Sequence, residues 1–139
     1  MVRMDTFEWP VRVYYEDTDA GGVVYHSQYL NFLERARTEW LRAAGFEQDR
    51  LREDPGLIFV VNRVAIDFLQ PARFNDALRI TVALREQRGA RLLLDQQVIS
   101  QDNDKILARA EVQVVCVDSQ RFRPLAVPSF ILEKLRDAD

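Results

Sequence analysis

Residues 28–44 carry the most extended helical pattern in the chain. The apolar residues of this segment recur at steps of three and four, and the run ends at a glycine; they are Tyr29, Phe32, Leu33, Ala36, Trp40, Ala43 and Ala44, followed by Gly45. This spacing predicts an amphipathic helix with one broad apolar stripe. At 1.5 Å per residue the helix is about 26 Å long, enough to cross a small domain. A helix with one apolar stripe must lie against another apolar surface.

The other patterns are typical of strands. Apolar and polar residues alternate directly after Pro10, in Val11–Tyr15, and the same period returns in four later segments: 63–68, 78–85, 91–100 and 106–117. Gly89 and the polar run 101–105 separate the last three segments, which predicts an antiparallel meander. Ser129 is expected to cap a short helix over Phe130–Leu135. We therefore predict an α+β fold in which a curved antiparallel sheet of about five strands wraps the long helix.

The size and charge of the chain narrow the possible functions. A chain of 139 residues predicts one domain, 1–139, and its 19 Lys and Arg against 22 Asp and Glu disfavour binding to nucleic acid. The first residues are acidic where a signal peptide is apolar, and no run of about 18 apolar residues occurs, so we expect a cytoplasmic protein. Cys116 is the one cysteine and sits in an apolar stretch, which indicates an inert buried thiol.

Several kinds of active site lack their sequence motifs. The one histidine, His26, is not part of a His-Glu-x-x-His pair, and no Gly-x-Ser-x-Gly motif is present. This disfavours zinc hydrolysis and a serine triad. The pair Gly21-Gly22 matches neither the dinucleotide-binding nor the P-loop pattern, so no cofactor is expected.

The segment 17–26 concentrates the remaining chemistry. It holds Asp17, Asp19, two glycines and His26 just before the predicted helix. A helix N terminus offers unpaired N–H groups that can stabilise an oxyanion, and a nearby carboxylate can act as nucleophile or general base. Alternatively, the two aspartates cap turns and His26 is a structural hydrogen-bonding residue. A magnesium site lacks a third carboxylate at a suitable spacing, so we expect no metal.

The same segment carries a family resemblance. Residues 11–26, continued by Tyr29-Leu30 and by 32–37, resemble the 4-hydroxybenzoyl-CoA thioesterase-like hotdog family, and the similarity extends over nearly the whole chain. Within that family the sequence is most similar to acyl-CoA thioesterases associated with the Tol-Pal system of Gram-negative bacteria. The resemblance implies a hotdog fold. It also implies that Asp19 is the catalytic carboxylate and that the backbone N–H of His26 polarises the thioester carbonyl.

The resemblance also implies how the substrate binds. Gly22, Val24 and Tyr25 would lie beside the substrate, with Gly22 permitting its close approach. Arg88 matches a nucleotide-binding arginine of relatives, and with Arg91 it flanks the Gly89 turn, so both are expected to bind the phosphates of coenzyme A. The expected substrate is a short-chain or aromatic acyl-CoA, with acyl carrier protein as a second candidate partner. The expected assembly is a tetramer of hotdog dimers with active sites at subunit interfaces.

The sequence leaves alternatives for the mechanism, for the His26 side chain and for the function. Asp19 either attacks the thioester directly or activates a water molecule, and the His26 side chain either orients water or hydrogen-bonds within the loop. A hotdog module that binds acyl-CoA or acyl carrier protein without turnover is the main alternative function. A hotdog dehydratase is less favoured, because its chemistry needs a His with an acidic partner and no such pair stands out.

Overall fold

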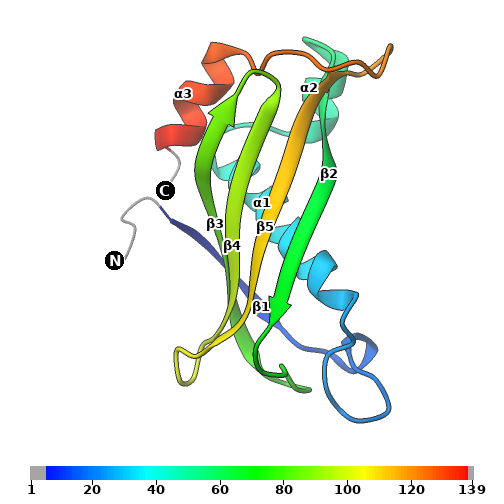
Figure 1. The fold of residues 1–139 in the computed structure, drawn as a ribbon, viewed down its shortest axis with the longest axis vertical. Coiled ribbons are helices and arrows are strands. Elements are labelled where there is room, and N and C mark those ends of the chain that lie inside the picture. The colour runs from blue at the N-terminus through cyan, green and yellow to red at the C-terminus, as the bar shows by residue number, and fades with distance from the viewer. Residues whose placement is uncertain (1–5, 138–139) are drawn as a thin grey trace.

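The computed structural model describes residues 6–137, so residues 1–5 of the N-terminal stretch used above against a signal peptide lie outside the described residues. One five-stranded antiparallel sheet curves around a long helix, as Figure 1 shows. The elements follow the order β1 Phe7–Arg12, η1 Tyr15–Asp17, α1 Gln28–Ala43, α2 Gln48–Glu53, β2 Leu57–Phe68, β3 Ala77–Arg88, β4 Arg91–Ser100, β5 Ile106–Asp118 and α3 Ser129–Asp137. The α+β class, the five strands and the central helix are confirmed.

The sheet has the strand order β1-β3-β4-β5-β2. Strands β3, β4 and β5 form the expected meander, with Leu84 opposite Leu94 and Leu94 opposite Val112. Strand β1 extends the sheet beyond β3, and β2 extends it beyond β5. Both β1 and β2 are therefore edge strands.

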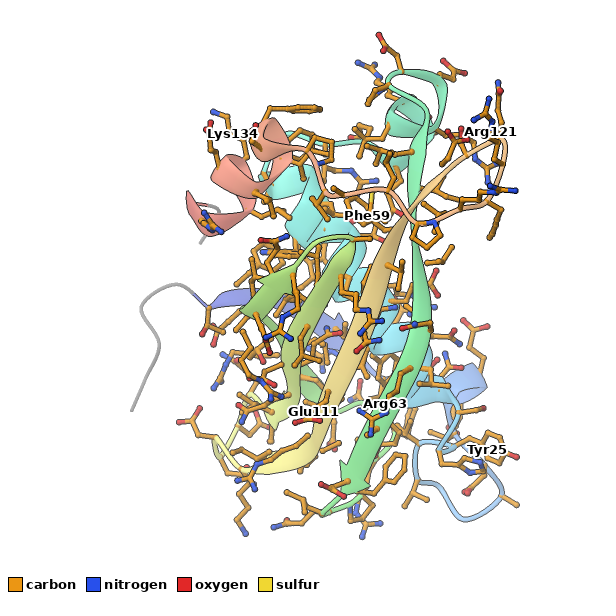
Figure 2. The ribbon with its side chains drawn as sticks, turned by 45° about the horizontal axis from the view of Figure 1, so that its top comes forward. Tyr25, Phe59, Arg63, Glu111, Arg121 and Lys134 are labelled. Atoms are coloured by element: carbon orange, nitrogen blue, oxygen red, sulfur yellow. The ribbon has the colours of Figure 1, made fainter. Side chains whose placement is uncertain are left out.

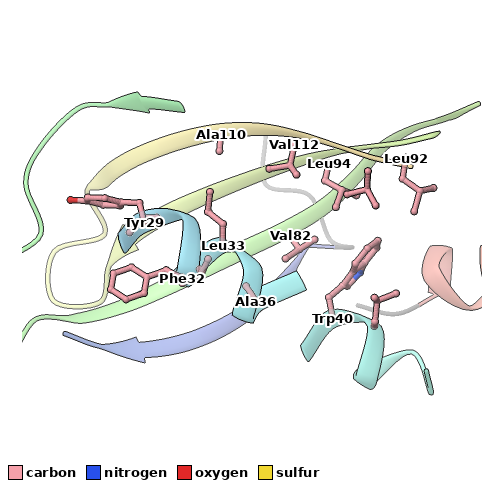
Figure 3. Packing of buried hydrophobic residues seen from close by; sticks show 14 of the residues in the cluster. Tyr29, Phe32, Leu33, Ala36, Trp40, Val82, Leu92, Leu94, Ala110 and Val112 are labelled. Atoms are coloured by element: carbon pink, nitrogen blue, oxygen red, sulfur yellow. The ribbon is translucent and has the colours of Figure 1, made fainter. Parts of the chain in front are cut away.

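Helix α1 buries the predicted apolar stripe against the sheet. Tyr29, Phe32, Leu33, Ala36 and Trp40 are all at most 3% exposed. Figure 3 shows them facing inward side chains of β4 and β5, among them Leu92, Leu94 and Val112. Each large apolar side chain buried in this way contributes about 1.5–3 kcal/mol. The stripe differs in one detail, since Ala43 is exposed and Leu41 is buried instead.

The first strand was predicted too far along the chain. The alternation indicated Val11–Tyr15, but β1 runs from Phe7 to Arg12 with Pro10 inside it. Proline is tolerated there because β1 is an edge strand. The chain then turns into η1, where the Asp17 carboxylate accepts the backbone N–H of Tyr14 at 2.8 Å. The alternation of apolar and polar residues does not report this side-chain hydrogen bond, so the sequence pattern did not predict the turn.

Two further elements differ from prediction. Strand β2 begins at Leu57 rather than at 63, because its first residues are a continuous apolar run without alternation. The short helix α2, Gln48–Glu53, was not predicted at all. Cys116 is fully buried as expected, and this burial raises the pKa of its thiol to about 11.

The long strands separate two ends of the molecule. At one end, a loop of residues 13–27 lies beside the chain between β2 and β3; we call this the aspartate end. At the other end lie the β3–β4 hairpin around Gly89 and the segment 119–127, joined by a hydrogen bond from Val127 N–H to the Gly89 carbonyl; we call this the hairpin end. Strand β3 connects them, and its 12 residues span about 36 Å at about 3.3 Å each.

Candidate active site

Asp17 organises the loop at the aspartate end. Its side chain is 4% exposed. One carboxylate oxygen accepts the Tyr14 N–H, and the other accepts the Gln28 side-chain amide at 2.7 Å. The Asp17 carbonyl also accepts the Tyr25 N–H at 3.0 Å. Asp17 therefore ties the start of the loop to the first residue of α1, which is a structural role.

Asp19, two residues later, is exposed. It opens a tight turn in which its carbonyl accepts the Gly22 N–H at 3.0 Å, and Gly22 has a φ of +79° that favours glycine. Its Oδ1 accepts the Gly21 N–H at 2.8 Å. No donor within residues 6–137 contacts its Oδ2. The turn therefore fixes the carboxylate and leaves one oxygen available for chemistry.

The loop reaches α1 with backbone donors unpaired. Across the described part of the chain, the N–H groups of His26 and Ser27 have no acceptor, and the Ser27 side chain does not cap the helix. Both groups sit at the positive end of the α1 dipole. A carbonyl oxygen that gains negative charge during a reaction is stabilised at such a place.

The neighbouring segment between β2 and β3 holds the loop in position. Val24 N–H donates to the Ala72 carbonyl at 2.8 Å, and Phe74 N–H donates to the Gly22 carbonyl at 3.4 Å. Ala72 N–H in turn donates to the Tyr29 hydroxyl at 3.0 Å. These bonds place the loop against the start of α1.

The side chains of the loop face different surroundings. Val24 is 5% exposed, whereas Tyr25 is 50% exposed. The Tyr25 ring lies 4.5 Å from the His26 ring, centroid to centroid. Of the predicted site residues, the structure thus brings together Asp19, Gly22, Val24, Tyr25 and His26 in one loop.

Arg88 and Arg91 lie at the hairpin end instead. Figure 2 shows Tyr25 on the loop at one end and Arg121, in the segment beside the hairpin, at the other. The Arg88 side chain is 84% exposed and pairs with Glu86 at 3.3 Å. Because β3 spans about 36 Å, neither arginine can reach a ligand group held near Asp19 of the same chain.

A groove along α1 was not predicted from the sequence. It lies between α1 and β2, has a volume of about 380 Å³ and begins at Leu30, in the first turn of the helix. Its walls are mainly apolar, with the half-buried Arg37 as the cation among them. Burial lowers the pKa of Arg37, and the charge of Glu34 partly offsets that shift. The signal in the sequence is an arginine four residues after Leu33 and four before Leu41, within an apolar stripe.

The described residues offer neither a metal site nor a membrane-spanning helix. In residues 6–137 no group of three or more His, Cys, Asp or Glu side chains is arranged to hold a metal ion. Within the same range, no helix is both long and apolar enough to cross a membrane.

Most of the chain, including the aspartate end and α1, is similar in sequence to known thioesterases. Residues 13–135 match the family model of the thioesterase-like superfamily. The chain is 48% identical over 122 residues to the acyl-CoA thioesterase YbgC of Haemophilus influenzae, with 88% of each chain covered. It is 45% identical over 130 residues to the acyl-CoA thioester hydrolase YbgC of Escherichia coli, with 94% of this chain and 96% of that protein covered.

Solved structures give the same result for the fold. A 1,4-dihydroxy-2-naphthoyl-CoA thioesterase from Synechocystis superposes with a TM-score of 0.87 at 25% identity, covering 95% of this chain and 96% of that one. A probable thioesterase from Bartonella henselae superposes with a TM-score of 0.83 at 34% identity, covering 88% and 99%. The chain therefore belongs to the thioesterase-like superfamily and is a thioester hydrolase with the hotdog fold.

Proposed function

We propose that the protein hydrolyses the thioester bond of short-chain or aromatic acyl-CoA to a free acid and coenzyme A. One observation carries the proposal: the loop that presents an available Asp19 oxygen also presents the unpaired His26 N–H at the α1 N terminus. The named thioesterases among the relatives support the substrate class. In this proposal Asp19 is the nucleophile or general base, and His26 N–H donates to the thioester carbonyl oxygen.

Two balanced routes use the same groups. In the first, an Asp19 oxygen bonds to the carbonyl carbon, the C–S bond breaks and the thiolate of coenzyme A leaves with a proton from solvent. Water then hydrolyses the mixed anhydride and restores the carboxylate. In the second, Asp19 takes a proton from water as the water adds to the carbonyl carbon, and collapse of the intermediate expels the thiolate, which is then protonated. His26 N–H stabilises the oxyanion in both routes.

The substrate phosphates require a second copy of the chain in this proposal. Strand β2 is an edge strand with exposed apolar side chains, Val61, Val64 and Phe68, at 42%, 37% and 51% exposure. Unpaired edges of this kind are templates for pairing with another strand. Two-fold antiparallel pairing through the middle of β2, near Arg63 in Figure 2, would set the hairpin end of one copy next to the aspartate end of the other.

That arrangement would let the partner's Arg88 and the partner's Arg91 bind the phosphates of a substrate whose thioester lies at Asp19. The expected tetramer would join two such dimers. The cytoplasmic location, the association with the Tol-Pal system and the use of acyl carrier protein follow from the sequence resemblance and belong to this same proposal.

The test is release of the coenzyme A thiol from a panel of acyl-CoAs, from acetyl-CoA to octanoyl-CoA and benzoyl-CoA. We expect release well above that of the Asp19→Asn protein for at least one short-chain or aromatic substrate. Calorimetric binding of these acyl-CoAs without thiol release would instead establish the non-catalytic binding module.

A further inference from the structure

Helix α1 leaves part of the inner sheet face uncovered. The helix packs most closely over β1 and β3, while Val61 and Val64 of β2 line the groove beside the helix. The floor of the groove comes from Leu92, Leu94 and Val114. Phe59 marks its end nearest the hairpin, as labelled in Figure 2, and Leu30 marks its other end, one turn beyond His26. An extended group that starts at the His26 N–H can therefore enter this groove.

Arg37 places unused hydrogen-bond donors in this apolar groove. Its Nη1 donates to Gln96 Oε1 at 3.0 Å, and this is the one hydrogen bond of its guanidinium within residues 6–137. Gln96 is 1% exposed and is itself fixed, because its amide donates to the carbonyls of Leu33 and Thr81 at 3.1 and 3.2 Å. A guanidinium has five N–H donors, and because Arg37 is half-buried, the donors that the groove shields from water gain from an acceptor on a ligand. The side chain is thus held in place with donors to spare.

The charges around the groove indicate which ligand group fits. Glu34, one turn before Arg37, is exposed and also lines the groove, and the two side chains form no ion pair in the described residues. Together they bring a net charge of zero. A carboxylate in the groove would be opposed by Glu34, whereas a neutral oxygen can accept from Arg37 without that repulsion.

We propose that the groove binds the acyl group of the substrate and that Arg37 selects acyl groups with a neutral oxygen, a hydroxyl or a carbonyl, at the end remote from the thioester. This inference rests on the proposed thioesterase function. It makes Arg37 a specificity-determining residue that contacts the substrate, at a position separate from the reacting atoms.

The helix rise gives the length of acyl chain that would reach from the His26 N–H to Arg37. Through Gln96, the Arg37 guanidinium is anchored at the level of Leu33. Leu33 is seven residues after His26, which is about 10 Å along the axis at 1.5 Å per residue. An extended acyl chain advances about 1.3 Å per bond, so eight carbons with a terminal oxygen, eight bonds in all, cover that distance.

The experiment compares octanoyl-CoA with 8-hydroxyoctanoyl-CoA by thiol release. We expect the wild-type protein to favour the hydroxylated substrate by at least about tenfold in kcat/KM, because the plain chain leaves the Arg37 donors unpaired. Arg37→Met keeps the length of the side chain and removes the donors, so the ratio should fall to about one. Arg35→Met is the matched control. Arg35 is exposed on the outer side of the same helix, and its loss should leave the ratio unchanged.

Four other results would contradict the role of Arg37 or the proposed function. A wild-type ratio near one would overturn the role of Arg37 even if Arg37→Met does not fold. Arg37→Met that keeps the wild-type ratio would also overturn it. If Arg37→Met instead weakens self-association in sedimentation and leaves the ratio unchanged, Arg37 serves an interface and the inference is wrong. No thiol release from any acyl-CoA by the wild-type protein would overturn the proposed function, and this inference with it.

Discussion

The aspartate end and the hairpin end of the molecule are built in opposite ways. At the aspartate end, the buried Asp17 accepts two hydrogen bonds from within the loop and one from Gln28 of α1, and the loop that holds Asp19 and His26 is thereby fixed. At the hairpin end, Arg88 is 84% exposed and is held by one ion pair with Glu86. The aspartate end is held by several hydrogen bonds, whereas the hairpin end presents exposed positive charge, which is what the proposed binding of phosphates requires.

The distance between the two ends matters as much as their chemistry. A strand of 12 residues lies between them, so a single chain holds the reacting groups and the arginines too far apart to share a substrate. The exposed edge of β2 offers a way to join the ends across two copies. Changes at the aspartate end should therefore affect turnover, and changes at the hairpin end should affect binding.

The largest effect is expected for Asp19→Asn. The change keeps the size of the side chain and its bond to Gly21 N–H while removing the negative charge. The turnover number should fall at least about 100-fold, with thermal stability nearly unchanged. Steady-state thiol release and a thermal melt check this. Asp17→Asn is the matched comparison and should lose much less activity; an Asp19→Asn protein within a few-fold of wild type would contradict the assignment.

The second largest effect is expected on KM when Arg88→Ala is combined with Arg91→Ala. In the proposed function these arginines contact phosphates remote from the thioester and bind ground and transition states alike, so KM for acyl-CoA should rise about tenfold while kcat stays nearly constant. The difference should shrink as the salt concentration rises. Arg35→Ala, an exposed arginine on α1, should leave KM unchanged. If KM of the double variant equals that of wild type at low ionic strength, the hairpin arginines are surface charges only.

A third, smaller effect is expected for the stability of Asp17→Asn. An asparagine has one side-chain oxygen in place of the two that accept from Tyr14 N–H and the Gln28 amide, so one half-buried donor loses its acceptor. The cost is about 1–3 kcal/mol of the free energy of unfolding. Urea titration measures it, with Asp49→Asn as control because Asp49 is exposed on α2. Equal unfolding midpoints for Asp17→Asn and wild type would show that the bonds of Asp17 contribute nothing.

The last effect, absent near neutral pH, is a pH dependence of stability from Cys116. Burial raises the pKa of its thiol to about 11 from an ordinary value of 9.0. Above the lower value the unfolded chain loses the proton and the folded chain keeps it, so stability is complete below about pH 9 and declines towards pH 11. Cys116→Ala should make this part of the decline disappear. Melting temperatures of both proteins from pH 8 to pH 11 test this, and parallel curves would contradict it.

The sequence predicted the fold well where the pattern was periodic. The stripe of α1 and the alternation of β3, β4 and β5 gave the core and the meander, because burial on one face imposes that spacing. The prediction failed where single side chains decide the path. Asp17 turns the chain into η1 where the alternation suggested a strand, and the start of β2 was missed because its apolar run has no period.

The candidate site was predictable in part for the same kind of reason. Asp19 and His26 are close in sequence, so a local motif places them in one loop. Arg37 was missed because its environment depends on Gln96 of β4, a contact between residues far apart in the chain. The separation of Arg88 from Asp19 likewise depends on the direction of β3 through the sheet.

The most direct test of the account is the activity of a purified mixed dimer. One copy carries Asp19→Asn, and the other carries Arg88→Ala with Arg91→Ala. If the site is shared between copies, the mixed dimer contains one intact site, and at low substrate concentration its rate should be about half that of wild type. If each chain uses its own arginines, no site is intact. The rate would then be about half that of the arginine variant, or about twentyfold below wild type, and this result would contradict the shared site.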